Sequence, residues 1–171
     1  NKPGSLKAEL TVRGNANMEK LCEELEVPFS RCGSLMVGYD ADSVQKLEQK
    51  LRNGEKNGVP GLRILTGAEA EAMEPALRKG VTAALYAPTT GTVNPWKLGI
   101  AAYENALQNG AEAMLNTEVT KIRREDGGYV LTTDRGELAA KTVFNCAGLY
   151  ADQVQELLRR VGGLDIEVRR N

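Results

Sequence analysis

The stretch that decides the fold is Thr142–Asp152, TVFNCAGLYAD. A short apolar run breaks at the small pair Ala147-Gly148, and Ala151–Arg160 then follows helical spacing. We therefore predict a buried strand at Thr142–Ala147 and a helix that begins within a few residues of Gly148. Small residues let the backbone approach a ligand, and the first turn of a helix favours an anionic one. The stretch is a candidate nucleotide site, while a plain packing turn is the alternative reading.

The residues before this stretch predict a helix, a short apolar run and a hairpin. Asn94-Pro95 is a strong helix start, with Asn as cap and Pro at the first position, so we expect a helix at Pro95–Asn109. Trp96 is expected to be a packing anchor, and small alanines suit an inward face. The apolar run Ala111–Asn116 follows, and then strands Val119–Arg123 and Tyr129–Thr133 flank the turn Glu125-Asp126-Gly127-Gly128.

The first half of the chain alternates helical and strand patterns. Ser5 can cap a helix that Pro28 ends, with apolar positions at near-helical spacing: Leu6, Leu10, Met18, Leu21 and Leu25. After it we expect a strand at Arg31–Asp40, a helix that begins at Asp42 and is stopped by Asn53-Gly54 and Asn57-Gly58, and a strand at Arg63–Leu65.

This order of elements resembles the D-amino-acid-oxidase-like superfamily of FAD oxidoreductases. The segment V-x-N-x-A-G-x-x-A-D is present as Val143, Asn145, Ala147, Gly148, Ala151 and Asp152. Three further stretches, Lys2–Leu25, Arg31–Asp40 and Ala87–Ala101, are similar to FAD-dependent glycerol-3-phosphate dehydrogenases of the bacterial anaerobic type and to L-2-hydroxyglutarate oxidases. The resemblance covers nearly the whole chain, and it implies a short helix after Thr66 and a strand at Val81–Tyr86.

The resemblance implies an α+β fold that is the central fragment of such an enzyme. In these families a G-x-G-x-x-G fingerprint precedes the corresponding region, and further flavin and substrate contacts follow it. The implied organisation is a helical segment of the FAD domain at residues 1–30, a substrate-binding lid at 31–91, and a partial FAD-binding domain with a β-meander at 92–171. The isolated chain is therefore expected to bind no FAD and to be inactive.

The resemblance also implies roles for particular residues. Val119 contacts the adenine of FAD through its backbone, and Ala147 and Gly148 approach the pyrophosphate or adenosine. The turn Thr90, Gly91 and Thr92 faces the substrate cavity, and Arg31 neutralises an anionic substrate. For each of these residues an ordinary strand, turn or surface role is the alternative. The catalytic base of the family lies outside this sequence.

Composition excludes several classes of function. The chain of 171 residues has 22 Lys and Arg against 23 Asp and Glu, so no net charge points to nucleic acid or anionic lipid. It contains no histidine, which excludes a Cys/His metal site and a His-dependent nucleophile within it. Three widely spaced cysteines, Cys22, Cys32 and Cys146, indicate reduced thiols in the cytoplasm. Cys146 is expected to be a buried thiol, and no catalytic or metal-ligating residue is predicted.

The function implied is oxidation of glycerol 3-phosphate to dihydroxyacetone phosphate by hydride transfer to FAD. Oxidation of L-2-hydroxyglutarate or an amino acid by the same fold is the first alternative, and a non-catalytic substrate-binding or interaction module is the second. The partner expected is a small anionic substrate, with an electron acceptor or membrane association only in the intact protein. Glu69, Glu71 and Glu74 are expected to form a solvated helix face without acid–base chemistry.

Overall fold

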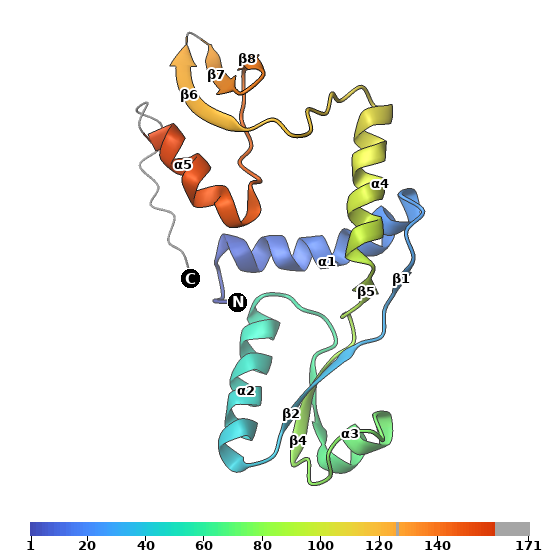
Figure 1. The fold of residues 1–171 in the computed structure, drawn as a ribbon. Helices are drawn as coiled ribbons and strands as arrows, with labels where there is room; N and C mark the ends of the chain where they lie inside the picture. Colours follow the sequence, from blue (N-terminus) through green and yellow to red (C-terminus); the bar gives the residue numbers. More distant parts are fainter. Residues whose placement is uncertain (126, 160–171) are drawn as a thin grey trace. The chain divides into compact units, whose positions relative to one another are not determined.

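The computed structural model describes residues 1–125 and 127–159, and these fall into two compact units that divide between Ala111 and Glu112. Figure 1 shows the elements of both units. The predicted domain boundaries after residues 30 and 91 lie within the first unit and remain a prediction about the intact protein. The first unit contains α1 (Leu6–Glu24), β1 (Phe29–Ser30), β2 (Ser34–Gly38), α2 (Ala41–Lys56), β3 (Arg63–Thr66), α3 (Gly67–Met73), β4 (Ala83–Ala87), β5 (Thr92–Val93) and α4 (Pro95–Gln108).

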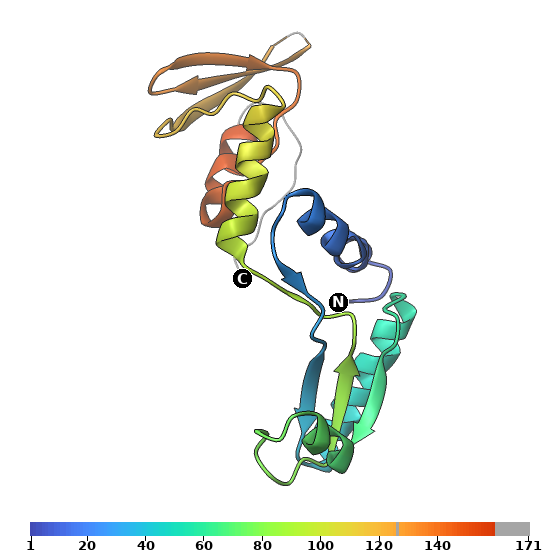
Figure 2. The ribbon, with the colours of Figure 1, turned by 90° about the vertical axis from the view of Figure 1, so that its right-hand side faces the viewer.

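A small antiparallel sheet with the strand order β2-β4-β3 is the core of the first unit. Helix α2 lies along one face and α3 covers the other (Figures 1 and 2). Consecutive residues of the central strand β4 therefore enter different clusters: Ala84 packs with Leu65 and Ala70 on the α3 side, and Leu85 packs with Leu47 on the α2 side. Because both faces are covered, the strand is apolar throughout.

Local capping fixes where the helices of this unit begin. Asp40 caps α2 by accepting a hydrogen bond from Ser43 N at 2.7 Å, so the helix begins at Ala41, one residue before the predicted start at Asp42. Thr66 and Glu69 form a reciprocal capping box at the start of α3. Asn94 caps α4 by accepting from Lys97 N, as the sequence predicted.

Glycines inside α1 and α2 do not interrupt these helices, and α2 ends at the predicted Asn57-Gly58 rather than at Asn53-Gly54. Helix α1 runs unbroken through Gly14, and α2 continues through Asn53-Gly54 to Lys56. A Cβ on Gly54 would lie 2.2 Å from the Leu62 side chain, so the glycine lets α2 pack closely against the following loop. The expected strands at Arg31–Asp40 and Val81–Tyr86 are shortened or shifted to β2 and β4.

The inward face of α1 differs from the predicted one. Ala8 and Cys22 are buried on this helix, whereas Leu6 and Leu10 are 68% and 52% exposed and Leu21 is also exposed. The helix ends at Glu24, before Pro28. Because α1 carries apolar residues on two sides, the sequence pattern alone does not select which of them faces this unit.

Helix α4 is also apolar and mostly exposed. None of the residues Pro95–Gln108 is buried, and Trp96 is 79% exposed, so its prediction as a packing anchor is wrong in this structure. The alanines that were expected inward find no sheet to pack on; only Ala101 among them is half-buried. In the part of the chain that the structure describes, no helix has the length and apolar character needed to cross a membrane.

The second unit is built on an antiparallel meander in the order β6-β7-β8, as the resemblance implied. Its elements are β6 (Val119–Glu125), β7 (Gly128–Thr133), β8 (Gly136–Ala140), a 3₁₀ turn η1 (Gly148–Tyr150) and α5 (Ala151–Arg159). Asp126 of the predicted hairpin turn and Arg160 of the predicted helix lie outside the described residues. The apolar run Ala111–Asn116 forms no strand, and Leu115 is 67% exposed.

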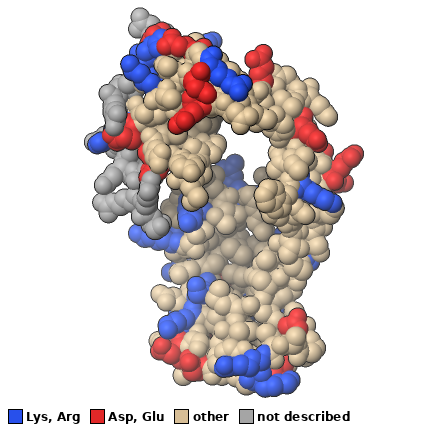
Figure 3. All heavy atoms as spheres, viewed as in Figure 1, with Lys and Arg blue, Asp and Glu red and all other residues tan. Residues whose placement is uncertain are grey.

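One face of this meander is apolar and the other is charged. Ile122, Leu131 and Leu138 are neighbours across the three strands, and Ile122 is buried. On the opposite face Arg123 forms ion pairs with Glu125 and Glu137. Acidic and basic side chains accordingly lie side by side over this sheet (Figure 3).

The stretch Thr142–Ala147 is not a strand, which corrects the first prediction of the sequence. It is irregular, Phe144 is 84% exposed and Cys146 is exposed rather than buried. A strand needs a neighbour for its backbone N–H and C=O groups, and none of the described strands pairs with these residues. The predicted helix after the break is confirmed, because η1 begins at Gly148 and α5 at Ala151.

Candidate functional site

The second unit contains a cavity of about 770 Å³ between β6 and α5. Val119 and Ala147, which lie 28 positions apart and were both predicted to contact the cofactor, line this cavity together. Tyr150, Gln153, Val154 and Leu157 from η1 and α5, with Glu118 and Thr120 beside Val119, complete the lining. The fold therefore brings these two predicted residues to one place.

The β6 wall of the cavity is fixed by backbone pairing. Glu118 N donates to Asp134 Oδ1 at 3.1 Å, and Asp134 N donates to Glu118 O at 3.3 Å, so the entry to β6 is tied to the β7–β8 turn. The ladder shifts register between Val119 and Lys121. Such an irregularity bends a strand and turns its side chains, here at the residues that border the cavity.

The opposite wall is shaped by Asn145, a residue of the recognised segment. Its side-chain Nδ2 donates to Ala151 O at 2.7 Å, and its Oδ1 accepts from Ala147 N at 3.2 Å. One amide side chain thus closes the turn from Asn145 to the start of α5 and sets the position of Ala147. The sequence motif contained this residue, but its structural role is visible only in the fold.

Gly148 has a conformational reason to be glycine. Its φ is +56°, in the left-handed region, and a Cβ built on it meets no atom within 4 Å. The backbone turn itself therefore favours glycine, or asparagine at some cost. The open space leaves room for a ligand, and the prediction that Gly148 contacts the cofactor stays a prediction.

The charge of the cavity favours a neutral or polar ligand group. Among the described residues that line it, Glu118 is acidic and none is Lys or Arg. Asp152 lies in the first turn of α5, where a carboxylate already interacts favourably with the positive end of the helix. The site is thus better suited to a base and ribose than to a pyrophosphate.

The predicted substrate turn Thr90–Thr92 lies in the first unit, where β1 and β5 form a short antiparallel ribbon. A Cβ on Gly91 would lie 2.3 Å from Cζ of Phe29 and 3.0 Å from Ser30 O. Packing within the chain therefore explains this glycine without any ligand. The carbonyl and the hydroxyl of Thr90 both have hydrogen-bond partners within the chain. Gly33 N donates to the carbonyl at 2.9 Å, and the hydroxyl lies 2.9 Å from Ser34 Oγ.

Arg31 holds this turn against α1. Its Nη1 donates to Thr89 O at 2.7 Å, its Nη2 donates to Asn15 O at 3.1 Å, and its Nε pairs with Glu19 at 3.0 Å. The guanidinium also lies 5.3 Å from the centroid of the Phe29 ring. Most of its donors are directed at protein groups, so the geometry supports a positioning role more than direct contact with an anion.

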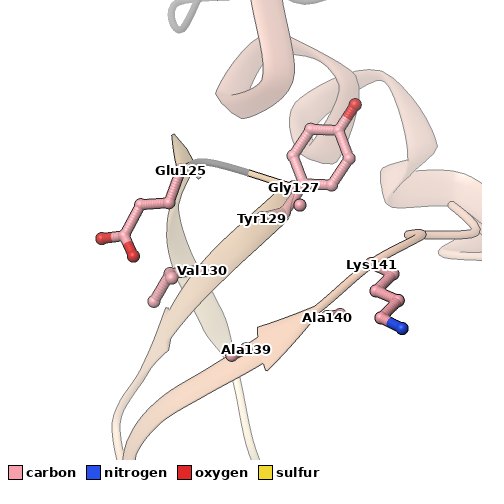
Figure 4. Close-up of a pocket in the computed structure, with 8 residues that line it drawn as sticks. Glu125, Gly127, Tyr129, Val130, Ala139, Ala140 and Lys141 are labelled. Carbon is pink, nitrogen blue, oxygen red and sulfur yellow. The ribbon is translucent and has the colours of Figure 1, made fainter.

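A second cavity of the meander, of about 440 Å³, is lined by none of the residues that were predicted to bind the cofactor or the substrate. Figure 4 shows it between the turn at Gly127 and the end of β8, with Glu125 and Lys141 on opposite edges of the sheet. Gly128 packs against the β8 end, where an added Cβ would lie 2.5 Å from Ala140 O. Hairpin geometry accounts for this hollow.

The glutamates of α3 have structural partners rather than acid–base chemistry. Hydrogen bonds from the Thr66 N–H and hydroxyl lower the pKa of Glu69, and those from Lys79 and Gly80 N lower the pKa of Glu71. Both groups are therefore held ionised, whereas a general acid or base needs a pKa near the working pH. The side chains of Glu69 and Glu71 are therefore held by hydrogen bonds, whereas the sequence predicted a solvated helix face.

Comparison with known proteins identifies a family whose model matches nearly the whole chain. The sequence model of the family described as FAD dependent oxidoreductase matches residues 1–170. Glycerol 3-phosphate dehydrogenase of Caloramator mitchellensis is 42% identical over 157 residues, which are 92% of this chain and 33% of the relative. L-2-hydroxyglutarate dehydrogenase of Indibacter alkaliphilus is 33% identical over 98% of this chain and 41% of its own length.

A solved structure has the same fold. L-α-glycerophosphate oxidase of Mycoplasma pneumoniae, determined with FAD bound, superposes with a TM-score of 0.84 at 23% identity over 98% of this chain and 44% of that protein. The present chain therefore spans about a third to two fifths of the length of the curated relatives it matches.

Proposed function

This chain belongs to the FAD-dependent oxidoreductase family, and from that premise we propose that the protein oxidises glycerol 3-phosphate to dihydroxyacetone phosphate. The proposal takes its reaction from the relative of 42% identity named glycerol 3-phosphate dehydrogenase. The proposed partner of this chain is a small anionic substrate, and no nucleic acid is proposed. We propose an electron-acceptor partner or an association with a membrane only for the intact protein. We place the protein in the cytoplasm, since all three cysteines are free thiols.

The observation that carries the flavin-dependent part of the proposal is the cavity that Val119 and Ala147 line together. FAD is the cofactor of the family, and when bound it supplies the acceptor for a hydride from the substrate carbon. The β6–α5 cavity fits the adenosine end of that cofactor, because its lining is largely uncharged and the β6 backbone borders it. Val119, Ala147 and Gly148 are the residues of this chain that we propose to hold it.

On the substrate side, the chain contributes a rigid turn. Arg31 and Asn15 both donate to the Thr89 carbonyl, and Ser34 Oγ lies 2.9 Å from the Thr90 hydroxyl, so the backbone at Thr89 and the side chain of Thr90 are both held. A fixed turn lowers the entropy cost of orienting a substrate. We propose that Arg31 acts by holding this turn, and that Thr90 and Thr92 border the substrate.

Oxidation of a 2-hydroxy acid is the second candidate. It is favoured by the relative of 33% identity named L-2-hydroxyglutarate dehydrogenase, which this chain matches over 98% of its length. An amino-acid substrate is the third candidate, supported by the solved glycine oxidase of Geobacillus kaustophilus, which is 27% identical over 93% of this chain with a TM-score of 0.82. A non-catalytic module of the same fold requires the same lid but has no observation of its own among the described residues.

The visible spectrum of the intact protein tests the reaction. Under anaerobic conditions glycerol 3-phosphate should bleach the flavin absorbance, while L-2-hydroxyglutarate at equal concentration should bleach it at least about tenfold more slowly. A faster reaction with L-2-hydroxyglutarate would replace the first candidate by the second. A protein that is purified with flavin but bleached by neither would contradict both.

Substitutions at Gly148 test the proposed cofactor site. Because φ is +56°, Gly148→Val strains the backbone and fills the open space, while Gly148→Asn fills the space with a residue that tolerates this conformation. We expect both variants of the intact protein to lose flavin, measured as the absorbance ratio of flavin to protein. Full flavin content in Gly148→Asn would show that the residue matters only as a turn.

A further inference from the structure

The first unit contains a third cavity, of about 520 Å³, that the proposed function does not use. It lies where the start of α1, the end of α2 and the outer part of the β2–β4 face meet. Its lining combines Lys2, Lys50 and the side-chain amides of Asn53 and Asn57 with the apolar Met36 and Leu85. None of these residues was predicted to bind a ligand.

The charged groups of this cavity have one sign. Lys2 and Lys50 approach it from different elements, and within the described part of the chain neither forms an ion pair. No Asp or Glu is among the described residues that line it. By contrast, Lys46, one turn before Lys50 on α2, is paired with Asp42 at 3.2 Å. The cavity is thus a locally positive hollow on a chain whose net charge is −1.

Amide groups add hydrogen-bond donors at the same place. Asn53 and Asn57 are half-buried on the last turns of α2. Asn57 Nδ2 donates to Asn1 O at 3.2 Å, which ties the two walls together and leaves a second N–H on the same nitrogen. Gly54 lets α2 sit close to Leu62, which holds this wall in place.

The floor of the cavity is apolar. Met36 and Leu85 are cross-strand partners on β2 and β4 and therefore share a face of the sheet, and Met36 is 46% exposed. A ligand with one anionic group and a short carbon chain would place its charge between the lysines and its carbon atoms on this floor.

We propose that this cavity binds a small organic anion, a phosphate monoester or a carboxylate, through Lys2 and Lys50. The site is separate from the turn at Thr90–Thr92, where Arg31 is already engaged by protein groups. It does not depend on which substrate the protein oxidises.

Nuclear magnetic resonance of the ¹⁵N-labelled intact protein tests the proposal by binding alone, with the Asn53 and Asn57 side-chain amides as reporters. Glycerol 3-phosphate, L-2-hydroxyglutarate and inorganic phosphate are titrated at constant ionic strength, with sodium chloride as reference. We expect saturable shifts of the Asn53 and Asn57 side-chain amides with an apparent Kd on the order of millimolar for at least one organic anion. Inorganic phosphate should bind more weakly than that anion, because it does not use the floor.

A matched pair of double variants separates the site from overall charge. Lys2→Gln/Lys50→Gln should weaken binding at least about tenfold, whereas Lys7→Gln/Lys46→Gln removes the same charge outside the cavity and should bind as the unmodified chain does. Equal loss in both pairs, equal affinity for inorganic phosphate, or no saturable shift would overturn the proposal. Because the measurement is binding alone, its outcome is independent of whether glycerol 3-phosphate bleaches the flavin.

Discussion

The two three-stranded antiparallel sheets of this protein differ in how their faces are covered. The β2-β4-β3 sheet has a helix on each face and two clusters of buried apolar side chains. The β6-β7-β8 meander buries Ile122 and Thr133 on one face, has α5 against β6, and carries ion pairs beside the buried Val130 on the other face. The first sheet owes its stability to apolar burial on both faces, and the second depends more on backbone pairing and charge.

Shortening a core side chain of the first sheet should have the largest effect. Leu65 is 2% exposed between α3 and β4, so Leu65→Ala should lower the free energy of unfolding by about 2–5 kcal/mol through lost burial and a cavity. Leu138→Ala in the meander, where the side chain is 40% exposed, should cost about 1 kcal/mol or less. Urea unfolding of both variants measures the two losses in free energy of unfolding. Equal losses would show that the two sheets do not differ in how much they depend on apolar burial.

A glycine at the edge of the same core should give the next largest effect. In Gly67→Ala the new Cβ would lie 1.8 Å from Val81 O, and the clash is with backbone, so α3 has to shift. We expect a loss of about 1–3 kcal/mol in the same urea experiment. Gly14→Ala in α1 is the control: it meets no atom within 4 Å and should stabilise by about 0.5–1 kcal/mol.

Hydrogen exchange sharpens the comparison without any substitution. The central strands β4 and β7 each have neighbours on both sides, so their amides differ mainly in the burial around them. Exchange from β4 should be at least about tenfold slower than from β7, measured at one pH by NMR or mass spectrometry. Slower exchange from β7 would mean that the meander is the more stable of the two.

The smallest effect should come from the charged face of the meander. Hydrogen bonds from Arg123 lower the pKa of Glu137 below its ordinary value. An acid with a lowered pKa in the folded state contributes stability above its unfolded pKa of roughly 4.3, and this contribution is lost as the pH falls through the lower, folded value. Arg123→Gln should therefore raise the pKa of Glu137 and remove this contribution to the loss of stability at acidic pH.

A carboxyl NMR titration follows the Glu137 pKa directly. Arg124→Gln serves as the control, because the adjacent residue on β6 points to the other face and makes no ion pair with Glu137 among the described residues. A Glu137 pKa unchanged by Arg123→Gln would show that the ion pair does not persist in solution.

The sequence determined features that depend on a few neighbouring residues. Ser5 and Asn94 cap their helices as predicted, because a cap needs only a side-chain oxygen and the N–H groups that follow it. The hairpin of β6 and β7 and the helix after Gly148 were predicted for the same reason, since turn residues and periodicity are local. The third strand of the meander was implied by the family resemblance instead. The family, too, was recognisable from short motifs.

The tertiary structure alone decided which apolar residues are covered and what the polar ones contact. Nothing local distinguishes the exposed Trp96 and Phe144 from the buried Ala84 and Ile122, because burial depends on elements far away in the chain. Thr142–Ala147 has a strand pattern, but the described residues offer it no neighbouring strand. Likewise Arg31 was read as an anion ligand, and only folding brought Thr89 O and Glu19 to its donors. Long-range contacts, which a sequence pattern does not encode, assign such residues their roles.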